Sequence, residues 1–160
     1  MKKYRIMFVC LGNICRSPLA HGIFEKLLKD ANLDGVVDVE SSGTSGFHRG
    51  EKPDPRMTGV AASHGVPLDH LRSQQFKKED LENFDLILPM DRENQEHIKK
   101  MMTSKDQKEK VKLFRDYDPE GKGLEVPDPY YGGPSGFEKV YNIAERTCRS
   151  LLGDVKPLVV

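Results

Sequence analysis

The sequence predicts a single α/β domain in which a four-stranded parallel sheet is flanked by helices on both faces. Short apolar runs suited to buried strands alternate with segments whose apolar residues recur every three or four positions. Strands that alternate with helices favour a parallel sheet, because each return connection crosses a face of the sheet. The length of 160 residues suits one domain spanning residues 1–160.

The first strand is predicted at residues 4–9, and the first helix begins after Ser17. Ser17 suits the N-cap, and Pro18 suits the first helical position. The apolar residues that follow repeat at helical spacing: Leu19, Ile23 and Leu27. The residues between strand and helix therefore form a tight loop, whose backbone N–H groups and helix dipole make an anion site.

Two side chains in this loop carry reactive chemistry. Cys10 ends the strand, where the helix N-terminus favours the nucleophilic thiolate over the thiol. Arg16 can hold two oxygens of a tetrahedral oxyanion in a bidentate fork. A thiolate, an amide cradle and a guanidinium together indicate an enzyme that attacks the phosphorus of a phosphate monoester.

The run VCLGNICRSP at residues 9–18 resembles the signature of the low-molecular-weight protein tyrosine phosphatases, and the resemblance covers nearly the whole chain. It implies that Cys10 is the nucleophile and that Arg16 binds phosphate and stabilises the transition state. It also implies that Asn13 braces the loop and that Ser17 hydrogen-bonds the thiolate. The expected phosphate-binding residues are Leu11, Gly12, Asn13, Ile14, Cys15, Arg16 and Ser17. The alternative, a buried core cysteine beside a surface arginine, fits this context poorly.

Three cysteines, an odd number, provide no disulfide framework and suggest no zinc site. The resemblance implies that Cys15 can capture an oxidised Cys10 as a disulfide, which would prevent irreversible oxidation. A packing role for Cys15 is an equally good interpretation. Cys148 lies on the apolar face of the last predicted helix and is assigned to the core.

A second strand is predicted at residues 36–41, followed by a turn-rich loop at residues 42–50 and a short helix after Arg56. By the resemblance, Ser41 supports the loop asparagine. Phe47 forms a wall of the substrate cleft, in a position where Trp is more usual. Packing of Phe47 under its own loop is the alternative.

His70 is a candidate for the same support. Many relatives carry a His four residues before a Gln in this segment, and that His joins the hydrogen bonds around the loop asparagine. Counting back from Gln74 places His70 in that role, whereas counting back from Gln75 places Leu71 there and leaves His70 facing solvent.

The third strand is predicted at residues 85–90 and a helix at 91–102. Because Pro89 cannot donate to a sheet ladder, the strand should end there or turn that position away from its neighbour. Asp91 is assigned to active-site support by the resemblance, or to the N-cap of the helix. Residues 103–110 read as a polar surface connection.

A short fourth strand is predicted at residues 111–114 and a last helix from Ser135. The apolar face of that helix follows spacings of three and four: Phe137, Val140, Ala144, Cys148 and Leu151. The ligand should lie beyond the carboxyl ends of the strands, where the Cys10 loop lies.

The segment at residues 125–133 carries the second chemical motif. Asp128 lies between two prolines and can protonate a leaving alkoxide or phenoxide, although alone it would read as an ordinary Asp-Pro turn. The whole run matches the general-acid loop of the family. Tyr130 and Tyr131 can form a deep slot for a phosphorylated aryl ring, too deep for phosphoserine.

Bulk properties limit the partners. Twenty-five basic and 25 acidic side chains give a formal net charge of zero, so no global field attracts nucleic acid or an anionic membrane. Nothing resembles a signal peptide or a membrane span, and we expect a cytoplasmic protein. A monomer is compatible with the sequence.

The resulting hypothesis is a protein tyrosine phosphatase that works by double displacement and requires no metal or cofactor, because Arg16, the amides and the dipole supply the charge stabilisation. The expected partners are phosphotyrosine-containing proteins, with small aryl phosphates as substrates in vitro.

Three alternatives remain. A protein arginine phosphatase of the same superfamily would typically have Thr in place of Ile14. A thioredoxin-coupled arsenate reductase needs further cysteines in the middle of the chain, and none lies between Cys15 and Cys148. A non-catalytic phosphoprotein-binding module would not need nucleophile, arginine and acid together.

Overall fold

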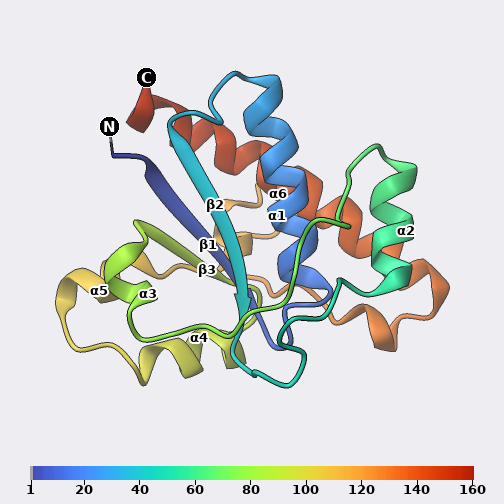
Figure 1. The fold of residues 1–160 in the computed structure, drawn as a ribbon, viewed down its shortest axis with the longest axis horizontal. Coiled ribbons are helices and arrows are strands. Elements are labelled where there is room, and N and C mark those ends of the chain that lie inside the picture. Colours follow the sequence, from blue (N-terminus) through green and yellow to red (C-terminus); the bar gives the residue numbers. More distant parts are fainter. Residues whose placement is uncertain (1) are drawn as a thin grey trace.

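A computed structural model describes residues 2–160, apart from the side chains of Tyr131 and Pro134. Its centre is a parallel sheet of three strands in the order β2-β1-β3 (Figure 1). Their bounds are Tyr4–Cys10 for β1, Val37–Gly43 for β2 and Leu86–Pro89 for β3. The predicted α/β fold with a parallel sheet is confirmed, and β3 ends at Pro89, where the missing N–H predicts an end.

The prediction of a fourth strand at residues 111–114 is wrong. Val111 makes only an isolated parallel bridge to Ile87, supported by a hydrogen bond from the N–H of Lys112 to the Ile87 carbonyl at 3.1 Å. The chain then enters a 3-10 helix, η1 (Phe114–Tyr117). Phe114, predicted in the strand, is instead buried against Phe8 of β1 at 5.6 Å between ring centroids. The Phe114 ring is therefore buried from the 3-10 helix η1 and not from a β-strand.

Helices cover both faces of the sheet. The face of β1 that carries Ile6 and Phe8 packs in one apolar cluster with α1 and α6, and Met7 and Val9 belong to a second cluster with α3 and α4. This alternation follows the two-residue period of a strand. The helix bounds are α1 (Arg16–Asp30), α2 (Pro55–Ser63), α3 (Asp80–Asn83), α4 (Arg92–Lys99), α5 (Lys105–Lys110) and α6 (Pro134–Val159), with a 3-10 turn η2 (Pro129–Tyr131).

The segment at 103–110, predicted as a polar connection, contains α5. Its N-cap is Ser104, whose side chain accepts from the N–H of Gln107 at 3.2 Å. Among residues 2–160, no helix combines the length and apolar character that crossing a bilayer demands.

The carboxyl ends of the strands meet at the Cys10 loop. Cys10 pairs with Gly43 of β2, and Val9 pairs with Pro89 of β3. Beyond β3, the N–H of Val126 donates to the carbonyl of Met90 at 2.9 Å, which brings the segment containing Asp128 to the same edge of the sheet. The fold thus gathers the predicted nucleophile and the predicted acid, which are far apart in sequence.

Candidate active site

The loop at residues 11–15 turns tightly between β1 and α1. Asn13 has a φ of 55°, in the left-handed region that asparagine tolerates better than most residues. Gly43 lies so close that a Cβ there would come within 2.7 Å of the Leu11 carbonyl oxygen. The loop path therefore depends on a glycine at the end of the neighbouring strand.

Cys10 lies at the base of this loop, with 3% of its surface exposed. Its Sγ accepts a hydrogen bond from the N–H of Asn13 at 3.3 Å and lies 3.0 Å from the Oγ of Ser17. The single Ser17 proton can point to this sulfur or to the carbonyl of Ser42 at 3.3 Å. Both donors are placed to stabilise a thiolate at Cys10.

Asn13 braces the loop through its side-chain amide. Its Nδ2 donates to the Oγ of Ser17 at 2.8 Å, and its Oδ1 accepts from the N–H of Gln74 at 3.0 Å. A further bond runs from Ser73 Oγ to the carbonyl of Gly12 at 2.9 Å. The segment around residues 73–74 thus holds the outside of the loop.

Arg16, the first residue of α1, is 8% exposed. Its Nη1 donates to Asp91 Oδ2 at 3.0 Å and to the carbonyl of Val126 at 2.9 Å. Burial opposes the charge on Arg16, but the neighbouring Cys10 and Asp91 outweigh burial, so the pKa of the guanidinium is raised. The side chain is oriented and remains cationic.

Asp91 fills both roles considered for it. Its Oδ1 accepts from the N–H of Asn94 at 2.8 Å and caps α4, while its Oδ2 holds Arg16. One carboxylate therefore connects the start of a helix to the anion site.

A cavity of about 480 Å³ opens above the loop. Cys10 and Arg16 line it together with Asp128, whose Oδ1 accepts from the N–H of Tyr130 at 3.0 Å. The nucleophile, the guanidinium and the carboxyl group predicted from the sequence thus share one cavity.

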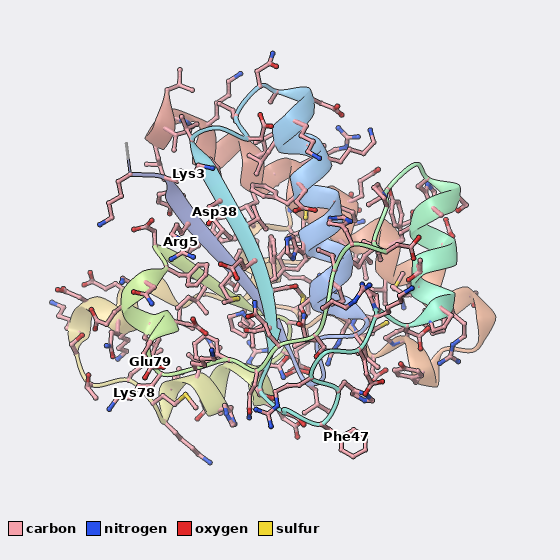
Figure 2. The ribbon with its side chains drawn as sticks, viewed as in Figure 1. Lys3, Arg5, Asp38, Phe47, Lys78 and Glu79 are labelled. Atoms are coloured by element: carbon pink, nitrogen blue, oxygen red, sulfur yellow. The ribbon has the colours of Figure 1, made fainter. Side chains whose placement is uncertain are left out.

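Two aromatic rings wall the cavity. Phe47 is 84% exposed and projects from the loop after β2 (Figure 2), so it does not pack under its own loop. Tyr130 donates its hydroxyl proton to Asp54 Oδ2 at 2.8 Å. Burial and the nearby Asp54 carboxylate raise the pKa of the Tyr130 hydroxyl, which keeps it a donor. The side chain of Tyr131 lies outside the described part.

Among the described residues, Ser41 and His70 bond other side chains than that of Asn13. Ser41 Oγ lies 2.9 Å from the Nδ1 of His21, a buried residue on α1 that was not singled out from the sequence. His70 Nε2 bonds Glu25 at 2.8 Å, and within residues 2–160 it makes no hydrogen bond to Asn13. Glu25 also lies 3.3 Å from His21 Nε2, so a chain of side chains runs from His70 through Glu25 and His21 to Ser41 Oγ.

His21 could have been found from its spacing, because it lies four residues after Ser17 and hence on the same helix face. Burial alone favours the neutral carboxyl of Glu25, but hydrogen bonds and charge from His21 and His70 outweigh it and lower the pKa of Glu25 to about 2. Glu25 is thus a carboxylate shared by two imidazoles.

Cys15 lines the same cavity, and its residue is 5% exposed. Burial, followed by the charge of Cys10, raises the pKa of the Cys15 thiol. Cys10, Cys15 and Cys148 are all free thiols in this structure. Cys15 is therefore a neutral thiol in the cavity that Cys10 also lines.

Comparison with known proteins agrees with this geometry. The family model described as "Low molecular weight phosphotyrosine protein phosphatase" matches residues 5–158. A low molecular weight protein-tyrosine-phosphatase of Streptomyces coelicolor is 41% identical over 158 residues, covering 98% of this chain and 96% of that protein. A human low molecular weight phosphotyrosine protein phosphatase is 44% identical over 148 residues, covering 92% of each.

The fold is also similar to that of a solved structure. The protein tyrosine phosphatase of Entamoeba histolytica, crystallised with Hepes in its active site, superposes with a TM-score of 0.91 at 35% identity. The match covers 99% of this chain and 100% of that one.

Proposed function

Because the chain belongs to the low molecular weight phosphotyrosine protein phosphatase family, we propose that this tyrosine phosphatase works by two displacements at Cys10. The observation that carries the proposal is the shared cavity of Cys10, Arg16 and Asp128. In the first displacement, the Cys10 thiolate attacks phosphorus and the bond from phosphorus to the phenolic oxygen breaks. The product is a phosphocysteine.

Charge in that transition state develops on the equatorial phosphoryl oxygens. The loop amides and the Arg16 guanidinium are the donors available to bind them. Asp91 and the Val126 carbonyl occupy Nη1 of Arg16, which leaves its remaining N–H groups for the phosphoryl group. This assignment gives the charge stabilisation to protein groups and gives no step to a metal.

Asp128 serves both halves of the reaction. As a carboxylic acid it donates its proton to the leaving phenolate. As a carboxylate it then takes a proton from water, which attacks the phosphocysteine and releases inorganic phosphate with Cys10 again a thiolate. The phosphoryl group passes from tyrosine to water.

Phosphorylated proteins are the substrates, and the aromatic walls support a preference for phosphotyrosine. Phe47 and Tyr130 offer ring faces to an aryl group, and a shorter phosphoserine side chain would leave its phosphate short of Cys10. The proposal includes small aryl phosphates as substrates in vitro.

The test compares phosphotyrosine, phosphoserine and phosphoarginine in one peptide sequence, with and without a chelator. We expect phosphotyrosine to be hydrolysed fastest and the chelator to change nothing. Faster turnover of phosphoarginine would instead support the arginine phosphatase. Retention of the phosphopeptide without phosphate release would support a binding module, and arsenate reduction with thioredoxin would support the reductase.

We also propose a protective role for Cys15. Peroxide converts the Cys10 thiolate to a sulfenic acid, and the Cys15 thiol condenses with it to form a disulfide and water. Peroxide should therefore remove two thiols per chain, and a thiol reductant should restore both the thiols and the activity. Irreversible loss of the Cys10 thiol alone would contradict this role.

A further inference from the structure

A second cavity, of about 600 Å³, lies across residues 125–133 from the catalytic cavity. We call residues 125–133 the acid loop. It is a groove between α2 and α6, and we call it the α2–α6 groove. Its carbon-rich lining comes from Pro55, Gly59 and Val60 of α2, from Phe137 of α6, and from Pro129 and Tyr130 of the acid loop. None of these groove residues belongs to the phosphate-binding loop.

The groove adjoins the catalytic cavity. Pro129 and Tyr130 line both cavities and so form the wall between them. This wall is fixed, since the Tyr130 hydroxyl bonds Asp54 at 2.8 Å and its ring meets Phe137 edge to face at 6.0 Å. A polypeptide whose phosphotyrosine fills the first cavity can therefore place a neighbouring side chain in the second.

The charge in the groove indicates what it accepts. Arg56 also lines it, with the guanidinium carbon 4.8 Å from the Tyr130 ring centroid and 4.7 Å from that of Phe137. The same guanidinium is paired with Asp54, whose Oδ2 lies 3.2 Å from Nη2. Because this charge is compensated within the protein and spread over two rings, the groove favours an apolar side chain over a carboxylate.

We propose that the α2–α6 groove is a specificity subsite that binds a large apolar side chain of the substrate polypeptide. The inference rests on the proposed function, which supplies the polypeptide. Groups packed on opposite sides of the Tyr130 wall lie about two ring-packing distances apart, roughly 9–14 Å. An extended chain covers that distance in about three or four residues. The apolar residue therefore lies about three or four positions from the phosphotyrosine.

The experiment measures kcat/KM for phosphotyrosine peptides that are otherwise alanine-rich. Phe, Leu, Ala or Glu is placed in turn at each of about five positions on either side of the phosphotyrosine, which brackets the estimated reach. At one position, we expect Phe or Leu to raise kcat/KM about tenfold over Ala, as apolar pockets do. Glu at that position should give no gain.

Gly59 offers a way to fill the groove. A Cβ at Gly59 meets nothing within 4 Å, and Trp is a better helix former than Gly. Gly59→Trp should reduce the ratio of kcat/KM for the Phe peptide to that for the Ala peptide from about tenfold to about one. Gly59→Glu, which places a carboxylate at the groove, should lower the same ratio.

The matched control is Gly153→Trp. Gly153 lies on α6 away from the groove, and a Cβ there also meets nothing within 4 Å. This variant should keep the wild-type ratio.

Equal turnover of all the peptides, or a preference for Glu over Phe, would overturn the inference while the proposed function stands. An undiminished ratio in both Gly59 variants would also overturn it. If no phosphotyrosine peptide is hydrolysed, the proposed function fails and the inference fails with it.

Discussion

At the scale of single residues, the site depends on side chains that each satisfy two demands. Ser17 contacts both the Cys10 sulfur and the amide of Asn13, and Asp91 both caps α4 and orients Arg16. Because each of these side chains makes two contacts, a few residues hold the reactive groups in place. A substitution that keeps one contact and weakens the other can separate the two roles of one side chain.

Asp91→Asn separates the capping role from the charge. Asparagine caps helices as well as aspartate does, so a fall in the melting temperature should come from the lost ion pair with the buried Arg16 and not from the cap. Its neutral amide oxygen binds Arg16 more weakly, and the loosened guanidinium should lower kcat/KM by about ten- to a hundredfold. Steady-state kinetics and thermal unfolding check both expectations, with the exposed Asp106→Asn as control. Wild-type kcat/KM in Asp91→Asn would contradict the role in orienting Arg16.

Asp128→Asn tests the general acid. It should lower kcat/KM for a phosphotyrosine peptide by about 10²–10⁴-fold, because the leaving phenolate is no longer protonated. The loss for para-nitrophenyl phosphate should be much smaller, since nitrophenolate leaves without a proton. Equal losses on the two substrates would argue against proton donation by Asp128.

At the scale of elements, α6 is tied to the segment after η1 by the buried Asp118. Its carboxylate accepts from Arg146 Nε at 2.8 Å, from Arg115 Nε at 2.9 Å and from the N–H of Glu120 at 2.9 Å. Arg115 also donates to the carbonyl of Glu125 at 3.0 Å. The acid loop thus begins from an anchored position.

Asp118→Asn should destabilise the fold by about 3–5 kcal/mol near neutral pH, because two arginines lose their buried partner. Hydrogen bonds from Arg146, which outweigh burial, lower the pKa of Asp118 from 3.8 to about 2. The stabilisation is therefore complete above pH 3.8 and is lost as the pH falls through about 2.

Denaturant unfolding of the wild type and Asp118→Asn across this pH range measures the difference. It should be constant near neutral pH and should shrink between pH 3.8 and about 2. Asp116→Asn, on an exposed neighbour in η1, is the control. A difference that does not change with pH would contradict the assignment.

At the scale of the whole molecule, one edge of the sheet collects four segments of the chain. The Cys10 loop, the loop after β2, the capped start of α4 and the acid loop meet there, while α1 and α6 cover the face behind them (Figure 1). The parallel sheet makes this convergence a consequence of topology, because all three strands point their carboxyl ends to the same edge.

The parts predicted well from sequence are those with local signals. The apolar run of β1 and the Asp128 loop each carry their own pattern. The predicted N-cap at Ser17 is wrong, because α1 begins at Arg16 after Cys15 and the Ser17 hydroxyl instead lies beside the Cys10 sulfur. The prediction of a strand at residues 111–114 was wrong because a short apolar run does not distinguish a strand in a sheet from a single β-bridge. The brace of Asn13 by the N–H of Gln74 could not be predicted, since a backbone donor 61 positions away has no side-chain signature.

The most direct test of the account is detection of phosphate on Cys10. Asp128→Asn should accumulate the phosphocysteine with para-nitrophenyl phosphate, because that leaving group needs no acid whereas hydrolysis of the intermediate still needs the base. Rapid quenching, proteolysis and mass spectrometry should find phosphate on the Cys10 thiol, and none in Asp128→Asn combined with Cys10→Ser. Phosphate on another residue, or turnover that persists after Cys10→Ser, would contradict the account.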